Sequence, residues 1–152
     1  MRSAARSTRF AATADVPLFY ADASALVKLI RDEPESGALR SFLDDADLVA
    51  CELVLTEAPR AVRRAAAHDP TLPLGVLLGR ADELLEALAL LPLDWGLLAA
   101  AAALAEPALR ALDAIHVAAA VALAPIDAFV SYDERRSAAG RLAGLRTIAP
   151  GV

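Results

Sequence analysis

The stretch that decides the fold is VPLFYADASALVKLI, residues 16–30. Its first part, residues 16–21, is a short apolar run of the length typical of a buried strand. The run ends at Asp22, and apolar residues then recur at helical spacing over residues 24–31. A strand, an acidic residue and an amphipathic helix in direct succession predict the first unit of an α/β fold.

The same alternation continues along the chain. Short apolar runs predict further strands, and longer stretches with helical periodicity predict helices between them. The other predicted strands cover residues 47–50, 89–93, 128–132 and 145–149, and the other predicted helices cover residues 35–43, 53–67, 74–88, 95–105, 112–123 and 134–142. Such alternation produces right-handed crossovers and a parallel sheet covered on both faces. We therefore expect an α/β fold with three layers (α/β/α) and a parallel sheet of about four or five strands.

Size and composition indicate one domain. The chain has 152 residues, and 57% are hydrophobic, many of them the helix formers alanine and leucine. Residues 1–15 are rich in arginine and alanine and have no apolar core of the kind that secretory signals carry. We expect a disordered leader or an early start codon over residues 1–15, and the domain over residues 16–152. The richest apolar stretch, residues 84–105, is interrupted by acidic residues and a proline, so no membrane span is expected.

Charge and cysteine content narrow the function classes. The single cysteine, Cys51, excludes an internal disulfide and a cysteine metal cluster, and it suits a reducing compartment such as the cytoplasm. The formal net charge of −5 argues against a broadly basic nucleic-acid surface. It is consistent with carboxylates that are concentrated in one place.

Four acidic residues stand out by position. Asp22 and Asp133 directly follow predicted strands, so both are expected at the carboxyl edge of the sheet, where open α/β sheets bind ligands. Glu57 and Asp113 lie inside apolar helical patterns, and Asp113 is expected to enter the interior near a helix start. A buried carboxylate is costly unless it is paired, protonated or bound to a cation. If the four meet, a divalent cation relieves their repulsion.

Oxygen-only ligands favour Mg²⁺ or Mn²⁺. Such an ion keeps several waters, orients or deprotonates one of them and neutralises charge on a phosphodiester. The predicted chemistry is metal-assisted phosphodiester hydrolysis. Simpler interpretations exist for each acid: Asp22 and Asp113 could cap helices or interact with their dipoles, Glu57 could form a surface ion pair, and Asp133 could belong to a charged turn.

Four segments together resemble the successive motifs of PIN domains, most of all those of VapC-type toxins of bacterial type II toxin–antitoxin modules. They are YADASALVKLI (20–30), ELVLTEAPRAV (52–62), LRALDAIHVAAA (109–120) and FVSYDERRSAAG (129–140). The similarity covers residues 18–148. The resemblance implies a three-layer α/β/α fold and an endoribonuclease that hydrolyses RNA phosphodiesters with one or two Mg²⁺ or Mn²⁺ ions.

By the same resemblance, Asp22, Glu57, Asp113 and Asp133 form the acidic catalytic quartet, and Asp22 and Asp113 are metal ligands. Ser24 matches the family's small hydroxyl residue beside the first aspartate, where it could hold that carboxylate or a metal-bound water.

The resemblance also implies partners, namely an RNA substrate, a homodimer and a cognate antitoxin that covers the site, commonly with a basic side chain. Arg60, Arg64 and Arg110 could contact RNA phosphates or the antitoxin, or they could simply be solvated surface residues. Cys51 stands where a serine or threonine often opens the Glu57 helix, which predicts a weaker cap.

Three residues near the quartet are expected to have packing roles. A lone histidine on an apolar helix, His116, is expected to be a satisfied core residue rather than a general base. Trp95 and Tyr132 are expected to pack in the core rather than to stack on bases.

Two rival function classes stay open. An acidic-pocket phosphatase of the haloacid-dehalogenase kind needs a second aspartate two residues after Asp22, where Ser24 stands, and a receiver domain needs a lysine after a late strand, whereas Lys28 comes early. The other rival is a catalytically inactive PIN-fold module that binds RNA or protein.

Overall fold

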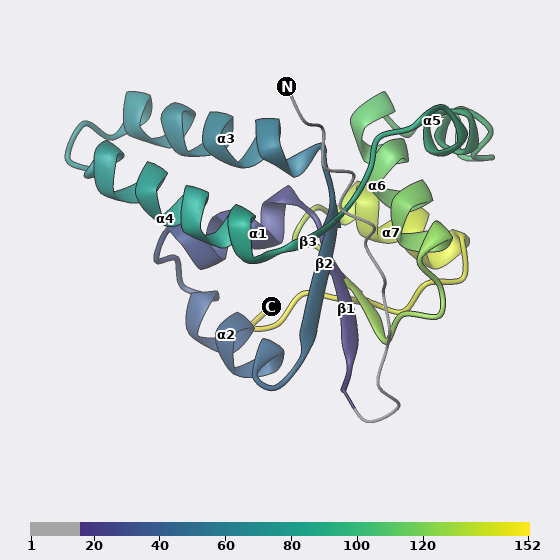
Figure 1. The fold of residues 1–152 in the computed structure, drawn as a ribbon, viewed down its shortest axis with the longest axis horizontal. Coiled ribbons are helices and arrows are strands. Elements are labelled where there is room, and N and C mark those ends of the chain that lie inside the picture. The colour runs from purple at the N-terminus through teal and green to yellow at the C-terminus, as the bar shows by residue number, and fades with distance from the viewer. Residues whose placement is uncertain (1–15) are drawn as a thin grey trace, which may run out of the picture.

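The computed structural model describes residues 16–152, and the expected leader over residues 1–15 lies outside the described residues (Figure 1). Strands and helices alternate as the periodicity predicts. In chain order they are β1 (Leu18–Ala21), α1 (Ala23–Ile30), α2 (Ser36–Leu43), β2 (Asp47–Cys51), α3 (Val54–His68), α4 (Leu74–Ala87), β3 (Ala89–Leu91), α5 (Trp95–Ala102), α6 (Ala111–Ala122), β4 (Ala128–Val130), α7 (Glu134–Leu142) and β5 (Thr147–Ile148).

The sheet has five parallel strands in the order β3-β2-β1-β4-β5. The chain adds β2 and β3 on one side of β1 and then returns to place β4 on the other side. This reversal makes the gap between the carboxyl ends of β1 and β4 the topological switch point, where open parallel sheets bind ligands. Asp22 follows β1 and Asp133 follows β4, so both predicted acids lie beside this switch point.

Helices cover both faces of the sheet, with α1–α4 on one face and α5–α7 on the other (Figure 1). The alternation of side chains along β1 divides the core accordingly. Tyr20 packs in the cluster under α5–α7, whereas Phe19 and Ala21 pack in the cluster with α1 and α2. The three-layer α/β/α prediction is confirmed. No helix within residues 16–152 combines the length and the apolar character needed to cross a membrane.

One local prediction holds in spite of a proline, and another is wrong. The helix predicted over residues 53–67 contains Pro59, and α3 begins at Val54 and continues through the proline. A proline removes only one intrahelical hydrogen bond, and buried Val62 anchors the helix beyond it. The expected core position of Trp95 is wrong: the side chain is 87% exposed, because it opens α5 while Leu97 faces the core.

Helix α7 packs closely on the sheet at Gly140, and a substitution there tests this contact. A Cβ atom at this position would lie 2.8 Å from Cδ1 of Phe129 and 3.0 Å from Cγ2 of Thr147. Because Phe129 is fully buried and cannot move aside freely, we expect G140A to lower the free energy of unfolding by about 1–3 kcal/mol. Urea denaturation followed by circular dichroism measures it.

The matched control is G79A in α4. No described atom beyond its own helix lies within 4 Å of a Cβ at Gly79, so this change should raise the free energy of unfolding by up to about 1 kcal/mol through helix propensity. Equal stability of G140A and the wild-type protein would contradict the close contact between α7 and β4.

Candidate active site

The first acid, Asp22, is fully buried at the end of β1. Its Oδ1 accepts hydrogen bonds from the hydroxyl of Ser24, at 2.5 Å, and from the backbone N–H of Ala25, at 3.1 Å. The second of these bonds caps α1. The capping interpretation of Asp22 is therefore correct, but it uses only one of the two carboxylate oxygens.

The other oxygen ties β1 to the loop after β4. The Ser131 hydroxyl donates to Asp22 Oδ2, and the backbone N–H of Tyr132 donates to Ser24 Oγ at 2.9 Å. Asp133 then caps α7, because its Oδ1 accepts from the backbone N–H of Arg136 at 2.9 Å. Asp133 is thus a helix cap at the edge of the site rather than a simple charged turn.

Arg136 joins the first acid to the third. Its Nη1 donates to Asp22 Oδ2 at 2.7 Å, and its Nη2 and Nε donate to Asp113 Oδ1 at 2.5 and 3.1 Å. Asp113 lies in the first turn of α6 and is buried, as expected, and Arg136 is buried as well. Burial opposes the positive charge, but the two carboxylates outweigh it and raise the pKa of Arg136 above its ordinary value.

Glu57 faces the same region from α3, and its partner is a histidine. The Nε2 of His116 lies 2.6 Å from Oε2 of Glu57, and its Nδ1 lies 2.8 Å from the Tyr20 hydroxyl. Burial lowers the pKa of the imidazole, but hydrogen bonds to Cys51 and Glu57 outweigh burial and raise this pKa to about 9. The ring is then protonated near neutrality and donates from Nε2 to the carboxylate.

Glu57, Asp133 and Arg136 line one groove of about 640 Å³, and Ser24 lies in its wall. Asp22 and Asp113 are joined by Arg136 at this groove, although neither is itself a lining residue. In the part of the chain that the structure describes, no three acidic, histidine or cysteine side chains converge tightly enough to make a ready metal centre. The structure therefore places Glu57 and Asp133 on the groove, whereas Asp22 and Asp113 lie behind it and are linked to it through Arg136.

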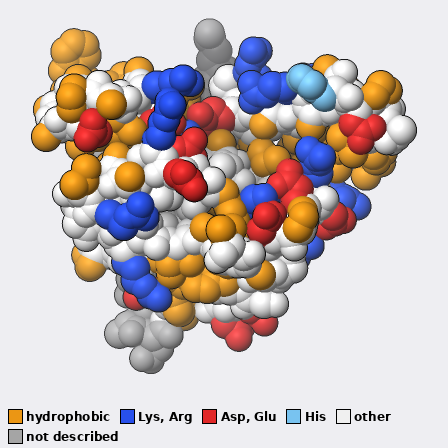
Figure 2. Space-filling view, turned by 180° about the vertical axis from the view of Figure 1, so that it is seen from behind, with side chains coloured by type: hydrophobic (Ala, Val, Ile, Leu, Met, Phe, Trp, Pro, Cys, Tyr) orange, Lys and Arg blue, Asp and Glu red, His pale blue; other side chains and the backbone are white. Residues whose placement is uncertain are grey.

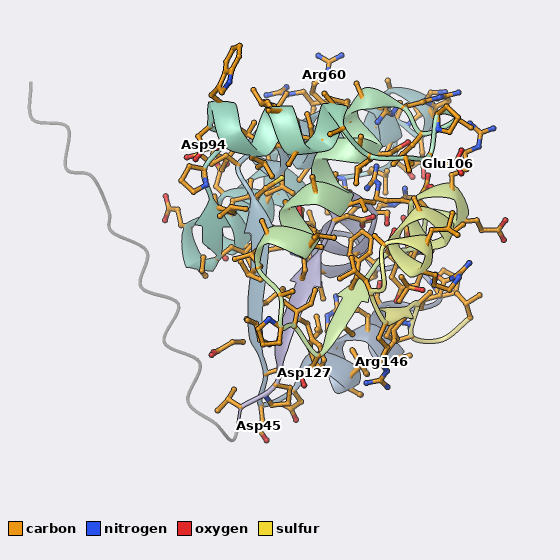
Figure 3. All side chains as sticks on the ribbon, turned by 90° about the vertical axis from the view of Figure 1, so that its right-hand side faces the viewer. Asp45, Arg60, Asp94, Glu106, Asp127 and Arg146 are labelled. Atoms are coloured by element: carbon orange, nitrogen blue, oxygen red, sulfur yellow. The ribbon has the colours of Figure 1, made fainter. Side chains whose placement is uncertain are left out.

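Charged side chains of both signs gather around the groove. Arg60 and Arg64, exposed on α3, line it together with Glu57. Figure 3 places Arg60 at the opposite end of the molecule from Asp45 and Asp127, which precede β2 and β4. The groove is thus at the carboxyl edge of the sheet. Figure 2, which views the molecule from behind relative to Figure 1, shows acidic side chains between basic ones near the top of the surface.

The remaining cations differ in position or in pairing. Arg110 is exposed at the start of α6 and is not among the residues that line the groove. Lys28 lines the groove but forms ion pairs with Glu33, at 2.6 Å, and Glu35, at 2.7 Å. Arg60 and Arg64 form no ion pair with any residue in 16–152, so they are the cations available to a ligand.

The donor set fits a hard divalent cation. Asp22 and Asp113 already converge on a single cationic group, and all the acids offer oxygen ligands, which Mg²⁺ and Mn²⁺ prefer. Asp22 and Asp113 share a single guanidinium, that of Arg136, so this pair carries more negative than positive charge and can be neutralised further by a bound cation.

Comparison with known proteins identifies the family of the chain. Residues 19–142 match the family model described as PIN domain. The chain is a PIN-domain protein. All four acids lie within the matched region, so the resemblance seen in the sequence motifs is confirmed at the level of the family.

This PIN domain is also similar to curated ribonucleases of Mycobacterium tuberculosis. It is 38% identical to Ribonuclease VapC35 of strain CDC 1551 / Oshkosh over 141 residues, 88% of this chain and 98% of the relative. It is 36% identical to Ribonuclease VapC47 of that strain over 141 residues, 89% and 98% of the two chains. It is 37% identical to Ribonuclease VapC46 of strain ATCC 25618 / H37Rv over 144 residues, 86% and 96%.

Sequence reasoning missed two features of the site. Arg136 was hidden in the run DERR, although an arginine in the first turn of a helix opposes the helix dipole and so signals a carboxylate partner nearby. His116 is a satisfied core residue, as expected, but its contact with Glu57 was not foreseen. The simpler interpretation of Glu57 as half of a surface ion pair does not hold, because His116 contacts this carboxylate instead.

The raised pKa of His116, which results from its hydrogen bonds to Cys51 and Glu57, predicts a pH dependence of stability. The pKa of His116 is raised from 6.5 to about 9 in the folded protein. The stabilisation is fully present below pH 6.5 and is lost as the pH rises through about 9, because the folded protein binds this proton more tightly than the unfolded chain. Urea unfolding in EDTA should therefore show a free energy of unfolding that falls across this range by roughly 1–3 kcal/mol.

H116Q should remove this pH slope, whereas H68Q should keep it, because His68 is exposed at the end of α3. A wild-type slope retained in H116Q would show that another group titrates.

Proposed function

We propose that this PIN domain is a Mg²⁺- or Mn²⁺-dependent endoribonuclease and the toxin component of a VapBC-type toxin–antitoxin system. In this proposal Asp22, Glu57, Asp113 and Asp133 form the active site, and Asp22 and Asp113 hold the metal. The observation that carries the proposal is the arrangement of these acids, drawn from distant parts of the chain, around one groove at the switch point of the sheet. The names of the relatives, which align over nearly their whole length, support RNA as the substrate.

In this proposal the side chains around the groove have separate roles. Ser24 and Ser131 orient the Asp22 carboxylate through their hydroxyls, and His116 holds the Glu57 side chain in place at the groove wall. The chemistry that Mg²⁺ or Mn²⁺ supplies when bound is Lewis-acid activation of the phosphodiester and of a water molecule. Asp133 adds negative charge at the mouth of the groove while it caps α7.

Arg60 and Arg64 are proposed to bind RNA phosphates. They lie one and two helical turns after Glu57 and line the same groove, so a phosphate held by them lies next to the acids. Arg110 lies outside the groove, which makes it a candidate for an antitoxin contact rather than for substrate binding.

The partners follow from the same proposal. A cognate antitoxin that inserts a basic side chain into the groove would pair with its carboxylates and exclude RNA. A homodimer and a cytoplasmic location are further parts of the proposal, based on the VapC resemblance.

One observation favours the alternative of a catalytically inactive PIN-fold module that binds RNA or protein. The Arg136 guanidinium already forms ion pairs with both Asp22 and Asp113. The two functions differ in one measurable respect, which is whether purified protein cleaves RNA when Mn²⁺ is added and stops when EDTA removes it.

The central test is D22N. Asparagine keeps the helix cap, because Asn and Asp cap helices equally well, but it removes the charge that binds metal. We expect the Mn²⁺-dependent cleavage of a fluorescent RNA to fall by more than the roughly 10–100-fold typical of changes outside the metal ligands. Circular dichroism checks that the fold is kept.

D82N is the matched control, since Asp82 is exposed on α4 and does not line the groove. Its cleavage rate should equal that of the wild-type protein. Cleavage by D22N at the wild-type rate would reject the proposed role of the quartet.

The phosphate contacts are tested by the double variant R60Q/R64Q. Removing two cations from the groove should raise the KM for RNA with little change in kcat, and it should reduce the slope of log affinity against log salt by roughly 1 per lost contact. R63Q is the control, because Arg63 is exposed on the same helix but does not line the groove. An unchanged KM and salt slope in the double variant would place the RNA elsewhere.

A further inference from the structure

Arg136 forms ion pairs with two of the proposed site acids, Asp22 and Asp113. Each of its three guanidinium nitrogens donates to Asp22 or Asp113. The side chain is 9% exposed, and the backbone N–H donates to Asp133 Oδ1. No other lysine or arginine within residues 16–152 forms an ion pair with either carboxylate. Within residues 16–152, Arg136 is therefore the sole cationic partner of Asp22 and Asp113.

We propose that Arg136 is a built-in counter-ion that competes with the divalent metal ion for Asp22 and Asp113. In the metal-free protein the guanidinium holds the two carboxylates, and metal binding requires it to leave them. This inference rests on the proposed function, because it takes Asp22 and Asp113 as the metal ligands.

The competition follows from the cost of buried charge. Without a cation, two neighbouring buried carboxylates repel one another and lose their hydration, which strongly destabilises the folded chain. Arg136 removes this cost in the metal-free state. A group that stabilises only the metal-free state lowers the apparent metal affinity by the factor by which it stabilises that state, because its contacts are lost when the metal binds.

The position of Arg136 allows the exchange. It lines the groove as well as contacting the acids, so the freed side chain has open space beside it and need not cross the core. The backbone anchor to Asp133 belongs to the α7 cap and does not depend on where the guanidinium lies. The alternative is that Arg136 is a permanent scaffold that keeps the two acids in place for the metal.

The two roles predict opposite changes in R136Q. A competing counter-ion predicts that R136Q binds Mn²⁺ at least roughly tenfold more tightly than the wild-type protein, with a lower Tm in EDTA and a larger rise in Tm on adding Mn²⁺. A permanent scaffold predicts weaker Mn²⁺ binding. Isothermal titration of the metal-free protein with Mn²⁺, together with thermal melts, measures both without any assay of activity.

The control is R135Q, one residue earlier on α7, where the arginine is exposed and forms no ion pair with another described residue. Its Mn²⁺ affinity and Tm should match the wild type. If R136Q does not fold in EDTA, Mn²⁺ is added to the unfolded variant; recovery of the native circular dichroism spectrum supports the competition, and failure to recover overturns it.

D22N separates the two proposals. Mn²⁺ binding that is lost in D22N but unchanged or weakened in R136Q overturns the role of Arg136 and leaves the metal site intact. Equal Mn²⁺ binding by D22N and the wild type overturns the metal site, and with it the inference about Arg136.

Discussion

A buried carboxylate at the end of the central strand is the constraint on which the rest of the structure depends. Asp22 has no contact with solvent, so every hydrogen bond that it needs must come from the protein. Ser24 and Ala25 supply two at the start of α1, and Ser131 and Arg136 supply two from the loop after β4 and from α7. Satisfying one charge thus fixes the relative positions of β1, α1, the end of β4 and α7, and both of these helices line the groove.

The overall fold could be predicted from the sequence because its signals are local. Apolar runs of strand length alternate with helical periodicity, and parallel strands place the residues that follow them at one edge. For this reason the sequence alone assigns Asp22 and Asp133 to the same edge of the sheet. The burial of Asp113 was also predictable, since its sequence neighbours are apolar.

Pairing within the site could not be predicted, because it depends on which helix faces meet. Arg135 and Arg136 are adjacent and chemically identical, yet one is exposed and the other is buried between two acids. Only the packing of α7 against α6 distinguishes them. The contact of His116 with Glu57 likewise requires α3 and α6 to meet across the end of the sheet.

The exposed indole at the start of α5 has a practical consequence. Trp95 is the chain's sole tryptophan and is 87% exposed. Intrinsic fluorescence excited at the indole therefore reports on the surface of α5 and not on the interior. Loss of the fold leaves this ring in water, as before, whereas a molecule that covers α5 moves it into an apolar environment and shifts its emission toward the blue. The protein thus carries a natural optical sensor for contacts on the side of the sheet formed by α5–α7.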